Sequence, residues 1–418
     1  ARRPLAVARA VVFAQLTDDP SVHPDRFPTE EDRDRERQRL FNLLRDLVRW
    51  ENSGNVALME KAYAEIAACF DGDPPVVVDP FCGGGTIPIE ARRLGLRTAA
   101  SDVNPVAVLI TKAMIELPIP FEGHAPVRPD DGKQLASRTD WEGYQGLAAD
   151  VEHYGARLIE LAAQKVGHFY MGPEDLVKAG ETPLAWIWAR TVRCPNPGCG
   201  GILPLVNSWW LSRPNKPTER RPRTYLQPRP SERGPWLSFA IARAGDPPPG
   251  TVSGDDVTCP LCGGRTTVDY VKEEGNAERM RVQLLAVNVD GGVRAYRTGD
   301  FEPTSLDYAG VEHVLTEMLP EQALGFRVQA YGFRSWGSFF TPRQLALLKA
   351  LVDGMAVVRE ELEGDGATPE YADVVMTYLG FLVDRIAAWN SAFSFWNPTG
   401  ENVKPATSNN YMPMRWSF

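Results

Sequence analysis

Long apolar stretches are missing from this sequence of 418 residues. No run approaches the roughly 20 apolar residues that a helix needs to cross a bilayer. The chain opens at Ala1 without a basic and apolar leader, and the missing initiator Met indicates that upstream residues are absent. We therefore expect no membrane contact and a cytoplasmic location. Hydrophobic residues make up 43% and charged residues 24% of the chain, which is typical of globular proteins, and the length predicts more than one folding unit.

Positive charge is also in short supply. The chain has 45 Lys and Arg residues against 54 Asp and Glu residues, a net charge of -9. A nucleic-acid contact must therefore come from a local patch. The candidate is the stretch 212–233, which is rich in Arg and Pro and is interpreted as an extended or mobile loop. Its basic residues are Arg213, Lys216, Arg220, Arg221, Arg223, Arg229 and Arg233. Phosphate neutralisation and a solvated loop without contacts are equally good interpretations.

Cysteine and histidine are scarce. Six cysteines are too few for a disulfide scaffold in a chain of this length. Four of them form two close pairs, Cys194-x4-Cys199 and Cys259-x2-Cys262, in turns rich in Pro and Gly. Four thiolates make a closed tetrahedral Zn²⁺ site without an open catalytic position, so a structural zinc ion is expected. Four buried or free cysteines are the alternative. No histidine stands at ligand spacing; these residues are His23, His124, His153, His168 and His313.

The N-terminal part alternates between helices and strands. Helices are predicted over 5–16, 29–50 and 55–70, and Thr29 with Asp32 forms a capping pair for the second of them. Pro74-Pro75 ends the helical pattern, and the β-branched run at 76–79 predicts a buried strand. A helix ending near Gly95, a strand over 97–102 and a helix over 106–117 follow. This order predicts a parallel α/β sheet.

The remainder of the chain has a different pattern. A Pro-rich connector reaches about residue 140, and a helix covers about 147–166. Short strands broken by Cys, Pro and Gly over 184–300 indicate an inserted β region. Helices return from about 342, before an irregular tail that contains Phe393, Phe395, Trp396, Trp416 and Phe418. Core or interface packing is favoured for these aromatic residues over stacking on a flipped base.

A glycine cluster stands between the first strand and the following helix. It reads Asp79-Pro80-Phe81-Cys82-Gly83-Gly84-Gly85-Thr86. Glycines let the backbone approach a ligand closely, and the helix N-terminus beyond supplies free N–H donors. Pro88 stands where a dinucleotide fingerprint needs its third glycine, which disfavours a nicotinamide or flavin cofactor. Because the carboxyl ends of neighbouring parallel strands share one crevice, Asp79 and Asp102 are expected to flank one ligand, with Asp102 at ribose hydroxyls. The alternative is a glycine turn with an N-cap Asp.

This segment resembles a known family. VVDPFCGGGTIPIEA followed by SDVNPVAV resembles motifs I and II of the amino-methylating S-adenosylmethionine methyltransferases, which act on DNA adenine, DNA cytosine-N4 or RNA guanine-N2. The resemblance implies that S-adenosylmethionine binds at Asp79, Pro80, Phe81, Cys82, Gly83, Gly85, Thr86, Asp102 and Asn104. Segments such as ARRPLAVARAVVFAQL, TPLAWIWARTVRC and FFTPRQLALL extend the likeness over nearly the whole chain. They are similar to the N-terminal half of the large prokaryotic adenine-specific DNA methylases with an inserted zinc-ribbon region.

The likeness implies an α/β fold with a Rossmann-like methyltransferase core, an inserted zinc-ribbon-like β region and C-terminal helices. We divide the chain accordingly into 1–120, the S-adenosylmethionine-binding core with its N-terminal helices; 121–183, a connector and helix; 184–300, the four-cysteine insertion; and 301–418, a helical region. The sheet is expected to be incomplete, because two convincing parallel strands flank the loop where such a fold requires about seven.

The catalytic loop of this superfamily is not found. That loop reads Asp/Asn/Ser-Pro-Pro-aromatic, holds the amino hydrogens of the target base and stacks on the base. Asp73-Pro74-Pro75-Val76, Asp246-Pro247-Pro248-Pro249 and Asn397-Pro398-Thr399 are each better interpreted as turns. No catalytic residue is therefore assigned, and the catalytic half is expected C-terminal to Phe418 or in a partner.

Three functions remain in competition. The first is a DNA adenine-N6 methyltransferase of a prokaryotic restriction-modification or anti-phage defence system, whose partners are DNA and other subunits of that system. The second is an RNA guanine-N2 methyltransferase, favoured by the DPFCGGGT loop. The third is a zinc-binding scaffold subunit without catalytic activity, which differs from the others if it has lost S-adenosylmethionine binding.

Overall fold

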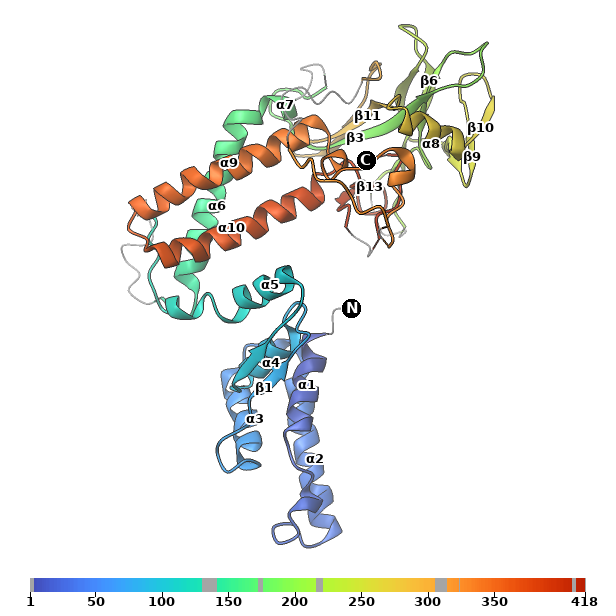
Figure 1. The fold of residues 1–418 in the computed structure, drawn as a ribbon. Coiled ribbons are helices and arrows are strands. Elements are labelled where there is room, and N and C mark those ends of the chain that lie inside the picture. Colours follow the sequence, from blue (N-terminus) through green and yellow to red (C-terminus); the bar gives the residue numbers. More distant parts are fainter. Residues whose placement is uncertain are drawn as a thin grey trace. The chain divides into compact units, whose positions relative to one another are not determined.

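The computed structural model describes residues 4–129, 141–171, 176–215, 221–304, 314–322, 324–407 and 411–417. The chain has a mixed α/β architecture and divides into two compact units (Figure 1). The first unit comprises Ala1–Glu152 and Leu362–Tyr378, and the second comprises His153–Glu361 and Leu379–Phe418. Helices α6 (Gln145–Val166), α9 (Pro342–Gly364) and α10 (Pro369–Trp389) each contribute residues to both units.

The first unit confirms the predicted alternation of helices and strands. Its elements are α1 (Leu5–Gln15), η1 (Pro20–Val22), α2 (Glu30–Leu47), η2 (Trp50–Asn52), α3 (Val56–Ala68), β1 (Val77–Asp79), α4 (Thr86–Arg93), β2 (Thr98–Ala100), α5 (Pro105–Ile115) and η3 (Ile119–Phe121). Strands β1 and β2 pair in parallel, with Val77 opposite Thr98 and Asp79 opposite Ala100. The prediction that 76–79 forms a buried strand is wrong, because Val78 is 65% exposed. Thr29 caps α2: its Oγ1 accepts the Asp32 N–H at 3.1 Å, and the Asp32 carboxylate accepts the Thr29 N–H.

A buried ion pair holds the helices of this unit together. Arg9 on α1 and Glu90 on α4 are 1% and 0% exposed, and Nε of Arg9 donates to Oε2 of Glu90 at 2.6 Å. Nη1 of Arg9 also donates to the Leu47 carbonyl at the end of α2, at 2.7 Å. Apolar side chains including Phe13, Ile66 and Leu94 complete this core. The Arg9 guanidinium thus has both an anion and hydrogen-bond acceptors, which a buried cation requires.

The second unit is built on antiparallel sheets. Its strands are β3 (Thr182–Arg193), β4 (Ile202–Leu205), β5 (Trp210–Ser212), β6 (Thr224–Pro230), β7 (Leu237–Ala242), β8 (Val252–Ser253), β9 (Asp256–Thr258), β10 (Arg265–Thr267), β11 (Arg281–Asp290), β12 (Arg294–Arg297), β13 (Phe395–Asn397) and β14 (Asn402–Lys404). They form sheets in the orders β12-β11-β3-β4, β5-β6-β7, β10-β9-β8 and β13-β14. Helices α7 (His168–Met171) and α8 (Val268–Asn276) and the turns η4 (Gln329–Tyr331) and η5 (Gly337–Phe339) complete it.

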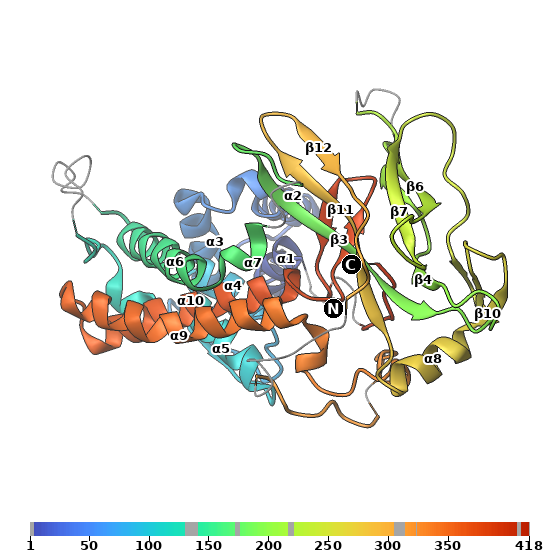
Figure 2. The ribbon, with the colours of Figure 1, turned by 90° about the horizontal axis from the view of Figure 1, so that it is seen from above.

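Two predictions for this region are wrong. The strands over 184–300 are not all short, because β3 and β11 have 12 and 10 residues and pair along their length (Figure 2). All residues of β11 from Val282 to Val289 are buried, so the strand lacks the alternation that identifies a strand with one wet face. The supposed loop at 212–233 contains β6, whose Pro228 and Pro230 lie beyond the part of the strand that pairs with β5.

Helices α9 and α10 confirm the predicted return of helices, and the aromatic tail is packed as favoured. Phe393 is fully buried and Trp416 is buried, while Phe395 and Trp396 are half-buried. Nε1 of Trp396 donates to the Leu211 carbonyl at 2.7 Å. Phe418 and His313 lie outside the described residues. The tail therefore closes the core of the second unit through the hairpin β13–β14.

Removing one member of the buried ion pair should destabilise the first unit. For Glu90→Ala we expect a loss of about 3–5 kcal/mol in the free energy of unfolding, because the Arg9 guanidinium then stays buried without its anion. Urea unfolding followed by circular dichroism measures this loss. The control is Asp73→Ala, which removes a solvent-exposed pair with Arg97 and should change stability by at most about 1 kcal/mol. Equal losses in the two variants would contradict the proposed role of the buried pair.

Candidate cofactor and metal sites

The glycine loop connects β1 to α4 at the carboxyl end of the strand. Asp79 is the last residue of β1 and Thr86 the first of α4, with Pro80 to Gly85 between them. The Phe81 ring is 83% exposed, while Cys82 is buried beneath the loop. The loop is thus open to a ligand and is not covered by packed protein.

Two glycines in this loop meet conformational demands that other residues satisfy poorly. Gly83 and Gly85 have φ values of 53° and 77°, in the left-handed region. A Cβ at Gly85 would also lie 2.8 Å from Oγ1 of Thr111 on α5. That hydroxyl donates to the Gly83 carbonyl at 3.2 Å and lies 3.5 Å from Sγ of Cys82. The loop is therefore held in one conformation against α5.

Asp102 joins the second strand to the same loop. Its Oδ2 accepts the Gly83 N–H at 2.9 Å, and its Oδ1 accepts the Asn104 N–H at 2.8 Å. These two backbone donors, that of Asn104 foremost, lower the pKa of the Asp102 carboxyl, which keeps it ionised. Each carboxylate oxygen retains a further lone pair that can accept a hydroxyl hydrogen bond. The arrangement suits ribose hydroxyls next to the loop.

Asp79 and Asn104 have local structural roles as well. Oδ1 of Asp79 accepts the Phe81 N–H at 3.2 Å, and the Asp79 carbonyl accepts the Ser101 N–H at 3.0 Å. Oδ1 of Asn104 accepts the Val106 N–H at 3.0 Å and caps α5. The N-terminus of α4, which follows the loop directly, has no side-chain cap that would occupy its N–H donors. The structure thus brings all the predicted cofactor residues to the carboxyl ends of β1 and β2. Their binding of a cofactor stays a prediction.

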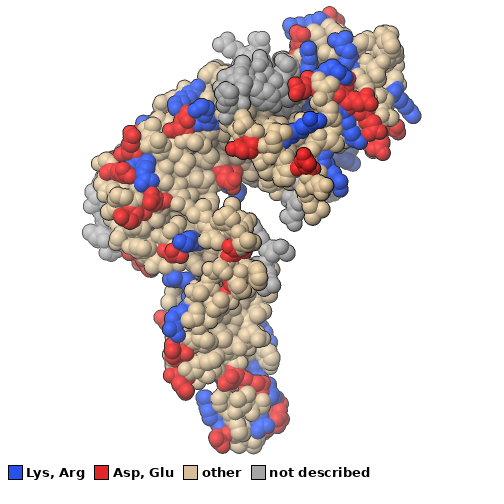
Figure 3. Space-filling view, viewed as in Figure 1, with Lys and Arg blue, Asp and Glu red and all other residues tan. Residues whose placement is uncertain are grey.

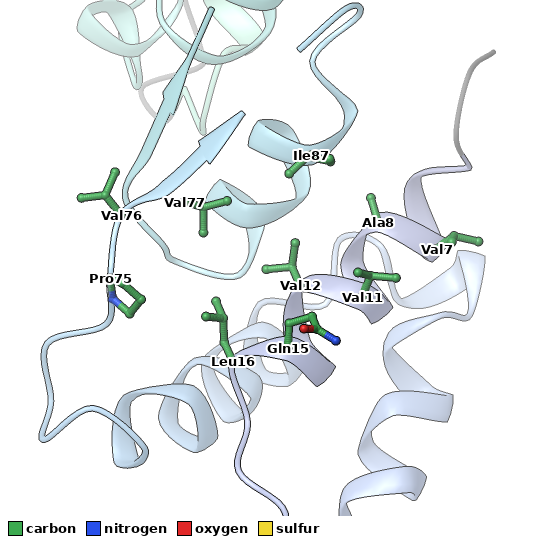
Figure 4. Close-up of a pocket in the computed structure, with 10 residues that line it drawn as sticks. All are labelled: Val7, Ala8, Val11, Val12, Gln15, Leu16, Pro75, Val76, Val77 and Ile87. Carbon is green, nitrogen blue, oxygen red and sulfur yellow. The ribbon is translucent and has the colours of Figure 1, made fainter. Parts of the chain in front are cut away.

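An apolar groove beside β1 is a feature that local sequence patterns missed. Among the described residues β2 is the one strand paired with β1, so the other edge of β1 is unpaired. A groove of 310 Å³ lies between this strand and α1 (Figure 4). It is lined by Val7, Ala8, Val11, Val12, Gln15, Leu16, Pro75, Val76, Val77 and Ile87. Backbone groups on an unpaired edge next to apolar side chains favour the addition of a further strand.

The four predicted metal ligands converge in the second unit. Cys194 directly follows β3 and Cys259 directly follows β9. The four sulfur atoms lie within 4.8 Å of one another, with 3.8 Å between Cys194 and Cys262 and 4.0 Å between Cys199 and Cys259. Sulfurs bound at about 2.3 Å around a tetrahedral Zn²⁺ lie about 3.8 Å apart. The cluster therefore has the dimensions of a four-thiolate zinc site, and no histidine joins it among the described residues.

Both cysteine pairs lie in turns shaped by backbone hydrogen bonds. The Cys194 N–H donates to the Gly201 carbonyl and the Cys259 N–H to the Gly264 carbonyl, at 2.7 and 2.8 Å. Without a cation, burial raises the pKa of Cys194 to about 12, whereas the Gly264 N–H lowers the pKa of Cys262 to about 7. A divalent cation would stabilise the thiolate form of all four.

Three of the basic residues between the cysteine pairs form ion pairs or hydrogen bonds with the protein. Arg221 pairs with Glu401 at 2.7 Å, Arg223 with Asp246 at 3.4 Å, and Arg233 donates to the Asp300 carbonyl at 3.1 Å. The interpretation as a solvated loop without contacts is therefore wrong for these residues. Lys216 and Arg220 lie outside the described residues. On the face drawn in Figure 3, Lys and Arg are interspersed with Asp and Glu.

Comparison with known families finds a match within the first unit. Residues 62–128 match the family model of the RMKL-like methyltransferase domain. The chain contains a methyltransferase domain. This match includes β1, the glycine loop, β2 and α5, and such a domain implies the use of S-adenosylmethionine. Residues 1–43 match a second family model, described as a protein of unknown function, DUF1156. No curated protein and no solved structure gave a significant match. No helix among the described residues is long and apolar enough to span a membrane.

Loss of the Asp102 carboxylate should weaken cofactor binding strongly without unfolding the chain. For Asp102→Ala we expect an affinity for S-adenosylmethionine at least roughly tenfold lower, because charged acceptors form strong hydrogen bonds with hydroxyls. Isothermal titration calorimetry measures the affinity, and circular dichroism checks the fold. Asp25→Ala removes an exposed carboxylate of the same unit and is the matched control. Unchanged affinity in Asp102→Ala would count against the site.

The cysteine cluster predicts a metal content that can be measured. Wild-type protein purified without chelator should contain one zinc ion per chain, and Cys194→Ser should lose it and unfold at a lower temperature. Elemental analysis and thermal unfolding test both points. Cys69→Ser, which changes a half-buried cysteine of the first unit, should keep the zinc. Wild-type protein without zinc would refute the assignment.

Proposed function

We propose that this chain is the cofactor-binding half of an S-adenosylmethionine-dependent DNA adenine-N6 methyltransferase of a prokaryotic restriction-modification or anti-phage defence system. The observation that carries the proposal is the hydrogen bond from the Gly83 N–H to Asp102, which joins loop and acid inside the matched methyltransferase domain. A glycine bend and a carboxylate on the neighbouring strand provide the groups that an adenosyl ligand requires.

The preference for adenine rests on the N-terminal segment. The DUF1156 model, which matches residues 1–43, is found in large adenine methylases. The ion pair between Arg9 and Glu90 joins this segment to α4 of the methyltransferase domain. The two matched segments are thus parts of one packed unit. This supports the inference that the methyltransferase domain shares the adenine specificity of the proteins in which the N-terminal segment is found.

The residues of the loop have distinct roles in this proposal. Bound S-adenosylmethionine supplies a methyl group activated by its sulfonium. Asp102 accepts hydrogen bonds from the ribose hydroxyls, and Asp79 lies at the amino-acid part of the ligand. Gly83 and Gly85 keep the backbone free of side chains where the ligand approaches. The N–H groups at the start of α4 favour the ligand carboxylate.

The proposal requires a catalytic loop at the carboxyl end of a strand next to β1, because the carboxyl ends of neighbouring strands share one crevice. The three Pro-containing candidates do not lie there. Asp73 precedes β1 and pairs with Arg97, Pro249 accepts the indole N–H of Trp209 at 3.0 Å, and Asn397 ends β13. We propose that a strand from the catalytic half pairs with the open edge of β1 and covers the apolar groove. DNA and further defence subunits are the proposed partners.

A second candidate is methylation of guanine N2 in RNA. The matched methyltransferase domain is RNA- and DNA-methylase-like, which favours this substrate as well. The two reactions differ in the modified base, so their products separate them.

Expression of the full-length gene tests the function directly. We expect mass spectrometry of host DNA to detect N6-methyladenine with the wild-type gene and with Asp25→Ala, to detect less with Asp102→Ala and to detect none without the gene. N2-methylguanine in RNA, with unmodified DNA, would support the second candidate. Absence of both modifications together with absent S-adenosylmethionine binding would identify a scaffold and contradict the proposal.

A further inference from the structure

The second unit contains an aromatic cavity of 410 Å³ that the methyltransferase assignment does not use. Its wall includes Tyr170 of α7, Trp186 and Trp188 of β3, Trp389 of α10 and Phe395 of β13. The two β3 tryptophans share one face of the strand, because side chains alternate and the residues between and beside them are buried on the other face. The cavity has the size of a small-molecule site.

Arg343 is the cation of this cavity. Its Cζ lies 5.4 Å from the ring centroid of Tyr170, 5.6 Å from that of Trp186 and 5.1 Å from that of Trp188. Within the described part of the chain, no carboxylate pairs with the guanidinium, and no Asp or Glu lines the cavity. Burial lowers the pKa of Arg343, which reflects the cost of enclosing this cation without an anion.

The position of Arg343 in its helix adds to the positive potential. It is the second residue of α9, which begins at Pro342. The N-terminus of a helix carries partial positive charge and favours anions, so a cation at this place is unfavourable unless an anion binds. Cation–π contacts offset a part of this cost. An anionic ligand would offset more.

The wall itself favours a flat ring. Trp389 is 38% exposed, so one part of its indole is available to a ligand. Asn390, Ser391 and Ser394 supply polar groups beside it. Aromatic platforms combined with an arginine are the means by which proteins hold single nucleotides of a nucleic acid.

We propose that this cavity binds a nucleotide, with its phosphate on the Arg343 guanidinium and its base stacked on the tryptophan wall. The inference rests on the proposed function in one respect, which is that the bound nucleotide belongs to a DNA strand. A free nucleotide would present the same chemical groups. Both sources present a base and a phosphate, so both depend on the same residues.

Calorimetric titration of the full chain tests the proposal. The probes are dAMP, deoxyadenosine, inorganic phosphate and a short single-stranded oligodeoxynucleotide. We expect dAMP to bind more tightly than either deoxyadenosine or phosphate. Arg343→Gln should lower the dAMP affinity roughly 10- to 150-fold, the range for hydrogen bonds to charged groups. Arg243→Gln, which changes an exposed arginine of the same unit, should leave it unchanged.

A second variant keeps the test decisive if Arg343→Gln fails to fold. Trp389→Ala should weaken both dAMP and deoxyadenosine, about 5- to 150-fold for the loss of one stacked base. If the variants lose oligonucleotide affinity as much as dAMP affinity, the site binds a nucleotide of a DNA strand. If they lose dAMP affinity alone, the site binds a free nucleotide. Unchanged dAMP binding in both variants would overturn the proposal. S-adenosylmethionine titration of the same samples reports the cofactor site separately, so that failure of the proposed function is distinguishable.

Discussion

The first unit depends on one buried contact, the ion pair between Arg9 and Glu90. It joins α1 to α4, and through the Leu47 carbonyl it also holds the end of α2. Because α4 begins at the glycine loop, the position of that loop follows from the packing of α1. A charge buried at this depth requires its partner in place. The N-terminal helix is therefore a structural component of the candidate cofactor site, although none of its residues belongs to the loop.

The site itself is held by hydrogen bonds more than by the size of its sheet. Two strands of three residues each are a weak scaffold. Two hydrogen bonds compensate for this weak scaffold. The Asp102 carboxylate accepts the Gly83 N–H, and the Thr111 hydroxyl donates to the Gly83 carbonyl. Both backbone groups of one glycine are thus fixed by side chains from the neighbouring strand end and helix. This explains how the loop keeps its shape while one edge of β1 has no described partner.

Prediction from the sequence succeeded where the signal is local. The β1 run, the glycine loop and the Thr29 cap each depend on residues a few positions apart, and the cysteine spacing predicted a cluster that the structure brings together. The β1 run predicted a strand correctly but its burial wrongly, because burial depends on distant parts of the chain. Contacts across the chain carry no such signal. Arg9 and Glu90 are 81 positions apart, β11 is buried on both faces, and the residues around Arg343 come from five separate elements. The strand β6 has a different obstacle, because its Pro228 and Pro230 are typical of loops.

The metal cluster and the aromatic cavity share one strand. Cys194 directly follows β3, and its N–H is held by the Gly201 carbonyl, so a bound metal fixes that end of the strand. Trp186 and Trp188 lie on the same strand a few residues earlier, where β3 pairs with β11 along its length. A metal ion at the four cysteines would therefore fix the end of the strand that carries Trp186 and Trp188. The proposed metal site at the end of β3 and the proposed nucleotide cavity along its face would then depend on one strand.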